Sequence, residues 1–297
     1  MPWKETWEEK AIRKRSSLVD LIPKEWRLPE SILKSLPKDS TVIPSQCGIL
    51  SELDLEITEI DDIDELARRI SICFKDQFNI KGVETTMGYV GYLGDILEYN
   101  SILVDCVLSL GAVVYVKTTV PQTLMLAETR SNLLGVTVNP RNRELSCGGS
   151  SGGEGSLVAL KGSICGFGTD IGGSVRTPAA VNGIYGLRPT EGRFPYGLVK
   201  NSLERQESVS SVVGPITRSL ANVRTILKAI MEAKPWLVDP KVHNIRWRED
   251  MFQESQVAKL SFGVIRFDHH VHLSPPVQRA IDMAVTALRK AGHEVVD

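Results

Sequence analysis

Residues 147–189 read CGGSSGGEGSLVALKGSICGFGTDIGGSVRTPAAVNGIYGLRP, and this stretch decides how the chain can fold. Fifteen of its residues before Val175 are glycine or serine. Such a composition is typical of low-complexity segments, but apolar residues interrupt the run at helix and strand spacing. That spacing predicts a helix over 153–160 and a short strand over 163–168. We therefore interpret the stretch as a folded helix–strand unit.

The sequence on both sides of this unit also predicts alternating helices and strands. Upstream, residues 71–82 predict a strand that runs into a loop, and residues 95–110 predict a helix that ends at Gly111. Residues 112–119 predict a buried strand, and Pro121 is expected to open another helix. Downstream, the pattern predicts a helix, a strand, a helix and a strand over 217–233, 259–267, 276–291 and 293–297. This alternation favours an α/β fold with a sheet covered by helices on both faces.

The N-terminal part of the chain differs in character. Residues 1–60 are expected to form a polar, proline-containing arm, and Trp3, Trp7 and Ala11 could share one face of a short amphipathic helix. A short helix is expected over 61–69, just before the strand that starts at residue 71. We therefore divide the chain into an arm, 1–60, and a domain, 61–297.

Composition excludes several classes of function. The chain has 297 residues and a net charge of −1, so a broad basic surface for nucleic acid gains no support. No apolar run approaches the ~18 residues of a membrane-spanning helix, and the charged N-terminus does not resemble a secretory signal. The five cysteines form no C-x-x-C pair, which indicates reduced thiols. We expect a cytoplasmic protein without nucleic-acid or membrane partners.

The glycine-rich loops can direct several main-chain N–H groups at one negative oxygen. A nucleotide phosphate is one candidate, but the Walker pattern requires Lys and then Ser or Thr where Glu154 and Gly155 stand. The other candidate is the oxyanion of acyl transfer, with Ser174 as the neighbouring nucleophile. Ser174 is not in a G-x-S-x-G motif, and all five histidines lie in the last third of the chain. The DHHVH segment, 268–272, lacks metalloprotease spacing and is interpreted as an exposed loop.

The segment 148–179 resembles the amidase signature through G-G-S-S-G-G-x-G, then D-I-G-G-S, then V-R-x-P. Further segments resemble the same family: FKDQFNIKGVETTMGY, GAVVYVKTTVPQ, NPRN, GIYGLRPTEGRFPYG and SSVVGPITRSL. The run KPWLVDPKVHNIRWRE is similar to the fungal general amidase or acetamidase branch. The resemblance implies the amidase-signature fold, with a central mixed sheet, and hydrolysis of small carboxamides to carboxylate and ammonia without a metal or cofactor.

The family's Ser–Ser–Lys triad is implied to fall on Lys75, Ser150 and Ser174, with Ser150 following a cis peptide bond. The resemblance also assigns oxyanion or substrate binding to the N–H groups of Ile171, Gly172, Gly173 and Ser174 and to Ser151, and supporting roles to Ser151, Asp170 and Arg176. A buried, neutral lysine can act as a base. It would take a proton from Ser150, which takes one from Ser174, and an acyl-enzyme would follow.

This sequence departs from the family in ways that leave alternatives open. Several dozen residues are absent just before the strand that carries Lys75, and the C-terminal part of the family's sheet is expected to be missing. A catalytically inactive, truncated paralogue is therefore one alternative, because an open pocket would keep Lys75 hydrated and protonated. The A-type chain of a tRNA-dependent amidotransferase is another, because it carries the same signature. The sequence leaves self-association into a homo-oligomer undecided.

Overall fold

A computed structural model describes residues 6–20, 71–204 and 206–296 of the chain. The chain divides into two compact units, Met1–Arg246 and Trp247–Asp297. Most of the arm expected over 1–60, and the helix expected over 61–69, lie outside the described residues. The proposed boundary near residue 60 therefore stays a prediction. Within the arm, the structure describes one helix, α1 (Trp7–Asp20), on which Ala11 is buried.

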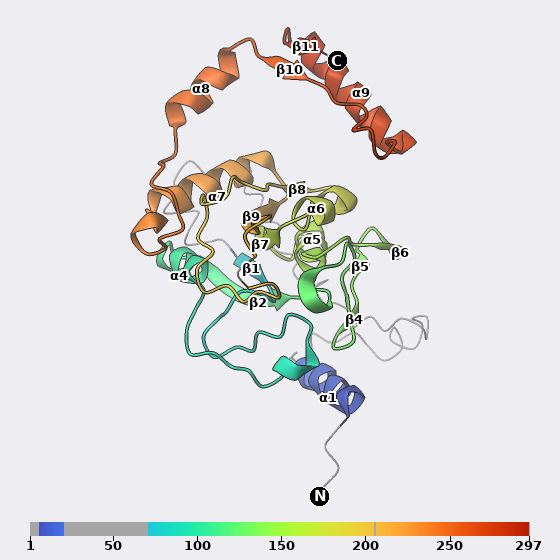
Figure 1. The fold of residues 1–297 in the computed structure, drawn as a ribbon, viewed down its shortest axis with the longest axis vertical. Helices are drawn as coiled ribbons and strands as arrows, with labels where there is room; N and C mark the ends of the chain where they lie inside the picture. The colour runs from blue at the N-terminus through green and yellow to red at the C-terminus, as the bar shows by residue number, and fades with distance from the viewer. Residues whose placement is uncertain (1–5, 21–70, 205, 297) are drawn as a thin grey trace, which may run out of the picture. The chain divides into compact units, whose positions relative to one another are not determined.

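The first unit is built on a five-stranded mixed sheet with the order β2-β1-β7-β9-β8 (Figure 1). Its strands are β1 (Ser71–Lys75), β2 (Val113–Thr118), β7 (Cys165–Asp170), β8 (Tyr185–Gly186) and β9 (Val212–Thr217). β1 runs parallel to β2 and β7, whereas β9 runs antiparallel to β7 and β8. Every residue of β7 and β9 is buried, so the centre of the sheet is covered on both faces. The predicted α/β class with a central mixed sheet is confirmed.

Helices and short elements surround this sheet. The helices are α4 (Ile102–Ser109), α5 (Gly152–Ala159), α6 (Arg176–Asn182) and α7 (Leu220–Glu232), with 3-10 turns η3 (Val90–Tyr92), η4 (Gln122–Leu124) and η5 (Pro235–Leu237). Two small hairpins pair β3 (Arg130–Ser131) with β4 (Gly135–Val136) and β5 (Val138–Asn139) with β6 (Asn142–Ser146). In α7 the Ser219 side chain caps the first turn by accepting from the Asn222 N–H.

The glycines of residues 147–189 allow α5 to pack closely against the sheet (Figure 1). A Cβ atom at Gly153 would lie 2.6 Å from main-chain atoms of Thr119, and one at Gly168 would lie 2.5 Å from the Ser151 Oγ. Real Cβ atoms do not approach so closely, so only glycine permits this spacing. The glycine content of the stretch is therefore a packing requirement of the helix–strand unit.

The two faces of β1 and β7 carry different cores. On one face, Cys73 packs with Val158 and Val175 from the helical layer and with Ile216 of β9. On the other, Phe74 stacks on Phe167 with ring centroids 5.3 Å apart. Because neighbouring strand residues point to opposite faces, the buried residues of β1 contribute side chains to both cores.

Several predicted elements differ from those observed. The helix predicted over 95–110 begins only at Ile102, and residues 95–101 form a loop. Ser101, just before the helix, accepts a hydrogen bond at its hydroxyl from the Asn79 N–H. The strand after it is an edge strand, with Val113 55% exposed, and is not buried. Pro121 precedes only the turn η4, where Thr123 has a φ of 70°, which a continuing helix does not allow.

The second unit contains α8 (Glu249–Val257), β10 (Ser261–Gly263), α9 (Pro275–Lys290) and β11 (Glu294–Val296). β10 and β11 pair in parallel, and α9 connects them. The predicted strand–helix–strand order is confirmed. Among the described residues of the chain, no helix is long and apolar enough to cross a membrane.

Candidate active site

Lys75 is the last residue of β1 and its side chain is fully buried. The Nζ atom lies 2.7 Å from the Ser150 Oγ, 2.8 Å from the Thr169 Oγ1 and 3.5 Å from the Thr169 carbonyl oxygen. Burial lowers the pKa of Lys75 from 10.5 to about 7, although Asp170 and Glu154 oppose the shift. A lysine in this position is uncharged in a substantial fraction of molecules near neutral pH, so it can act as a base.

Ser150 and Ser151 lie at the turn that enters α5. The peptide bond between Gly149 and Ser150 is cis, as the resemblance implies. Ser151 is buried, and its N–H donates to the Ser174 carbonyl over 3.1 Å while its hydroxyl donates to the Thr169 carbonyl over 3.4 Å. Ser151 does not line the pocket described below. It therefore ties the serine turn to β7 and to the Ser174 loop, and the expected role in substrate binding is not supported.

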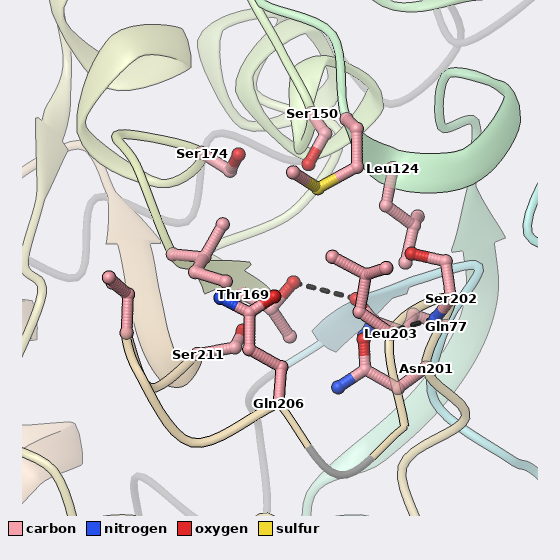
Figure 2. Close-up of a pocket in the computed structure, with 13 residues that line it drawn as sticks. Gln77, Leu124, Ser150, Thr169, Ser174, Asn201, Ser202, Leu203, Gln206 and Ser211 are labelled. Carbon is pink, nitrogen blue, oxygen red and sulfur yellow. Dashed lines mark hydrogen bonds between the residues drawn. The ribbon is translucent and has the colours of Figure 1, made fainter.

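The loop after β7 brings Ser174 to the same space as Ser150, with both hydroxyl groups directed into it (Figure 2). In the described part of the chain, the N–H groups of Ile171, Gly172 and Ser174 have no hydrogen-bond acceptor. The Gly173 N–H differs, because it donates to the Asp170 Oδ1 over 2.8 Å. This donor is therefore engaged in the structure, and its expected role at the oxyanion stays a prediction.

Asp170 holds this loop in place. Its buried carboxylate accepts hydrogen bonds from the N–H groups of Gly173, Val175 and Arg176 and from the Arg176 guanidinium, and Arg188 lies 3.6 Å away. Burial alone would raise the pKa of Asp170, but the Arg176 side chain and the main-chain donors outweigh it and lower the pKa to about 2. Asp170 and Arg176 thus brace the loop that carries Ser174, and the supporting role that the resemblance assigns to them stays a prediction.

Glu154 is a buried acid that the sequence analysis did not single out. Its Oε1 accepts from the Thr118 hydroxyl over 2.6 Å, and its Oε2 accepts from the Cys73 thiol over 2.7 Å. Burial raises the pKa of Glu154 to about 7, against the opposing effects of those hydrogen bonds and of Lys75. A signal existed in the sequence, because Glu154 is the one charged residue among the glycines and serines of 148–156.

The pocket beside these groups has an empty volume of about 420 Å³ that includes open solvent. Its lining combines the two serines with amide, hydroxyl and apolar side chains (Figure 2): Gln77, Leu124, Met125, Ser150, Thr169, Ile171, Ser174, Asn201, Ser202, Leu203, Gln206, Val209 and Ser211. Sequence analysis missed Gln77 and Thr169, although both lie in segments that resemble the family, because the resemblance assigned neither of them a role. Within the described residues, no group of three His, Cys, Asp or Glu side chains could hold a metal ion.

Residues 51–297 match the protein family described as Amidase. The chain is 39% identical to the acetamidase of Emericella nidulans over 356 aligned residues, which cover 98% of this chain and 64% of that protein. It is 43% identical to Amidase 1 of Gibberella moniliformis over 227 residues, which cover 76% of this chain and 44% of that protein. The chain therefore spans less than two thirds of the length of these relatives. Because the 356 aligned positions exceed the 297 residues of this chain, the acetamidase has segments that this chain lacks.

Solved structures agree with the fold. Fatty acid amide hydrolase superposes with a TM-score of 0.81 at 29% identity, covering 99% of this chain and 62% of that chain. A 6-aminohexanoate cyclic dimer hydrolase superposes with a TM-score of 0.67 at 26% identity, covering 79% of this chain and 50% of that chain. A glutamyl-tRNA(Gln) amidotransferase chain from Thermotoga maritima is only 22% identical, with a TM-score of 0.64, so its likeness shows the fold alone.

Proposed function

Because the chain belongs to the amidase family, we propose that it hydrolyses the C–N bond of small carboxamides with Lys75, Ser150 and Ser174 as its catalytic groups. The observation that carries the proposal is the buried Lys75 amine, 2.7 Å from the Ser150 hydroxyl. No carboxylate of the described residues lies within 4.0 Å of that amine to hold its charge.

The proposed reaction moves one proton along the three side chains. Neutral Lys75 takes the proton of Ser150, which takes the proton of Ser174, and the Ser174 oxygen attacks the amide carbonyl carbon. The N–H groups of Ile171, Gly172 and Ser174, which have no acceptor among the described residues, then stabilise the oxyanion. Losing one such donor typically raises the activation free energy by about 3 kcal/mol. The relayed proton passes to the leaving nitrogen, so ammonia or an amine departs from an acyl-enzyme. Water then releases the carboxylate and restores the Ser174 hydroxyl.

The pocket lining is compatible with a carboxamide substrate. Amide and hydroxyl groups of Asn201, Ser202 and Ser211 line the pocket beside the serines. Such groups match the hydrogen-bonding capacity of a carboxamide. The apolar side chains of the lining (Leu124, Met125, Ile171, Leu203 and Val209) can contact the acyl part of the substrate. The relative named acetamidase is consistent with this class of substrate.

A catalytically inactive chain is the second candidate, and one observation favours it. The relatives have segments that this chain lacks. If those segments wall the pocket, water would surround Lys75 and raise its pKa toward 10.5. The chain would then bind an amide without hydrolysing it.

Labelling with a fluorophosphonate, followed by mass spectrometry of the modified peptide, tests the proposal. We expect modification at Ser174, with a rate that rises as pH increases through about 7, the pKa of Lys75. Ser174→Ala should abolish labelling, and Lys75→Met should remove its pH dependence.

Matched controls at exposed positions, Ser109→Ala and Lys241→Met, should label like the unmodified chain. Release of ammonia from acetamide gives the second measurement. A folded protein that neither labels at Ser174 nor releases ammonia would instead support the inactive chain.

A further inference from the structure

A chain of hydrogen bonds continues from Lys75 beyond the three proposed catalytic groups. Lys75 Nζ donates to the Thr169 Oγ1 over 2.8 Å, and that hydroxyl donates to the Gln77 Oε1 over 2.6 Å. The Gln77 Nε2 donates to the Tyr196 hydroxyl over 3.2 Å, and Tyr196 donates to the Ser211 Oγ over 3.0 Å. In each of these four hydrogen bonds, the donor is the group nearer to Lys75 and the acceptor is the group farther from it. The direction of this hydrogen-bond network therefore determines which groups the Lys75 amine can donate to or accept from.

A neutral lysine has two N–H donors and one lone pair. Both oxygen atoms of Thr169 lie within 3.5 Å of the Lys75 Nζ and can accept these two hydrogens. The lone pair is then left for the Ser150 Oγ, 2.7 Å away. This arrangement requires the Thr169 hydroxyl to accept from Lys75. It does so because its single hydrogen is already donated to Gln77.

The orientation of the Gln77 amide decides the direction of the Thr169 hydroxyl. With the amide reversed, Nε2 would donate to the Thr169 Oγ1, and the freed hydroxyl hydrogen would turn to the lone pair of Lys75. The base would then accept from Thr169 in place of Ser150. Thr169 would still contact both Lys75 and Gln77, but both hydrogen bonds would run in the opposite direction and the amine could not receive the serine proton.

Tyr196 holds the Gln77 amide in the productive orientation. Its hydroxyl hydrogen goes to Ser211, and one of its lone pairs accepts from the Asn201 Nδ2 over 3.3 Å. The remaining lone pair can only face a donor, which is the Gln77 Nε2. Burial raises the pKa of Tyr196, so the hydroxyl keeps its hydrogen at the pH of the reaction.

We propose that Gln77 and Tyr196 are positioning residues that direct the Thr169 hydroxyl away from Lys75 and so reserve the lysine lone pair for Ser150. The inference rests on the proposed hydrolase function. It adds two residues that touch neither the attacked carbonyl nor the oxyanion.

Two replacements of Gln77 separate a positioning role from simple packing. Gln77→Leu removes the acceptor, so the rate of fluorophosphonate labelling and the kcat for acetamide should fall by about tenfold or more at every pH. The KM should change by less than about threefold. Gln77→Glu keeps an oxygen for the Thr169 hydroxyl but adds a negative charge, which should move the rise in rate about one pH unit upward.

At pH values above this shifted rise, the labelling rate of Gln77→Glu should be within about threefold of that of the unmodified chain. If Gln77 acted only through packing, Gln77→Glu should be slower than Gln77→Leu at every pH, because a buried carboxylate disturbs packing more than leucine does. Tyr196→Phe should lower kcat in the same way as Gln77→Leu, whereas Tyr185→Phe, at an exposed position outside the pocket, should not. Circular dichroism and thermal unfolding verify that each variant is folded.

The inference is overturned if Gln77→Leu and Tyr196→Phe label within about threefold of the unmodified chain, or if Gln77→Glu is as slow as Gln77→Leu at all pH values. Those results would leave the proposed function standing, because Ser174 would still be labelled. If the unmodified, folded chain fails to label at Ser174, the proposed function fails and the positioning role falls with it.

Discussion

Gly166 of β7 faces the buried side chain of Glu154, and replacing it with alanine tests how tightly α5 packs on the sheet. An added Cβ would lie 1.8 Å from the Glu154 Oε2 and 3.0 Å from the Cys73 Sγ. The carboxyl group cannot keep its place at that separation. It would have to leave the hydrogen bonds that it accepts from Cys73 and Thr118.

The expected loss of stability follows from three contributions. Overpacking a filled core costs about 1–3 kcal/mol, and leaving a buried polar group without its partner costs about 1–3 kcal/mol. Alanine in place of glycine restricts the unfolded chain and returns only about 0.4–1 kcal/mol. Gly166→Ala should therefore lower the free energy of unfolding by about 1–6 kcal/mol, which corresponds to a fall in Tm of roughly 2–24 °C for a unit of this size.

Urea and thermal unfolding followed by circular dichroism measure this effect. Gly91→Ala is the matched control, because an added Cβ there meets no atom within 4 Å. Removing the carboxyl group first, with Glu154→Ala, should reduce the cost of Gly166→Ala to less than about 1 kcal/mol in the double variant. A Tm for Gly166→Ala equal to that of Gly91→Ala, or costs that simply add in the double variant, would refute the close packing.

Three further changes have defined outcomes. Lys117→Met breaks a nearly buried ion pair with Asp76, 2.7 Å long, and should cost about 3 kcal/mol of unfolding free energy, whereas Lys81→Met, in an exposed pair, should cost less than about 1 kcal/mol. The free energy of unfolding should rise between about pH 7 and 10.5, because the unfolded chain binds the lysine proton there and the folded chain does not. Lys75→Met should remove this rise, and an unchanged slope of the urea midpoint against pH would contradict the expectation. Asp170→Asn should flatten the loss of stability as pH falls from 3.8 to about 2, because the folded chain keeps that carboxyl ionised and the unfolded chain does not; equal acid titrations of the two proteins would count against it.

The elements that sequence reasoning located well are those with strong local patterns. The glycine-spaced unit of 147–189 predicted both α5 and β7, and the amphipathic repeats predicted α7 and α9 to within a few residues. Main-chain spacing and apolar periodicity are local properties, so the sequence alone expresses them. The proximity of Lys75 to Ser150 was also predictable, but only through the resemblance to a family, since the two residues are 75 positions apart.

The differences arose where a contact that the local pattern does not encode decides the outcome. Val113 begins an edge strand because no further strand pairs beside β2 among the described residues, and nothing within 112–119 encodes that position. Gly173 was expected to donate to the oxyanion, yet its N–H is held by Asp170. A glycine-rich sequence shows that N–H groups can converge, but it does not show which of them another side chain will bind.

The sequence by itself determined that helices and strands alternate, that residues 147–189 form a helix–strand unit, and that the chain resembles the amidase family. Only the tertiary structure decided which donors face the pocket and how the hydrogen bonds around Lys75 are directed through Thr169, Gln77 and Tyr196. The physical reason is that periodicity and glycine spacing are carried by neighbouring residues. The direction of a hydrogen bond and the pKa of a buried amine depend instead on partners that folding brings together from distant parts of the chain.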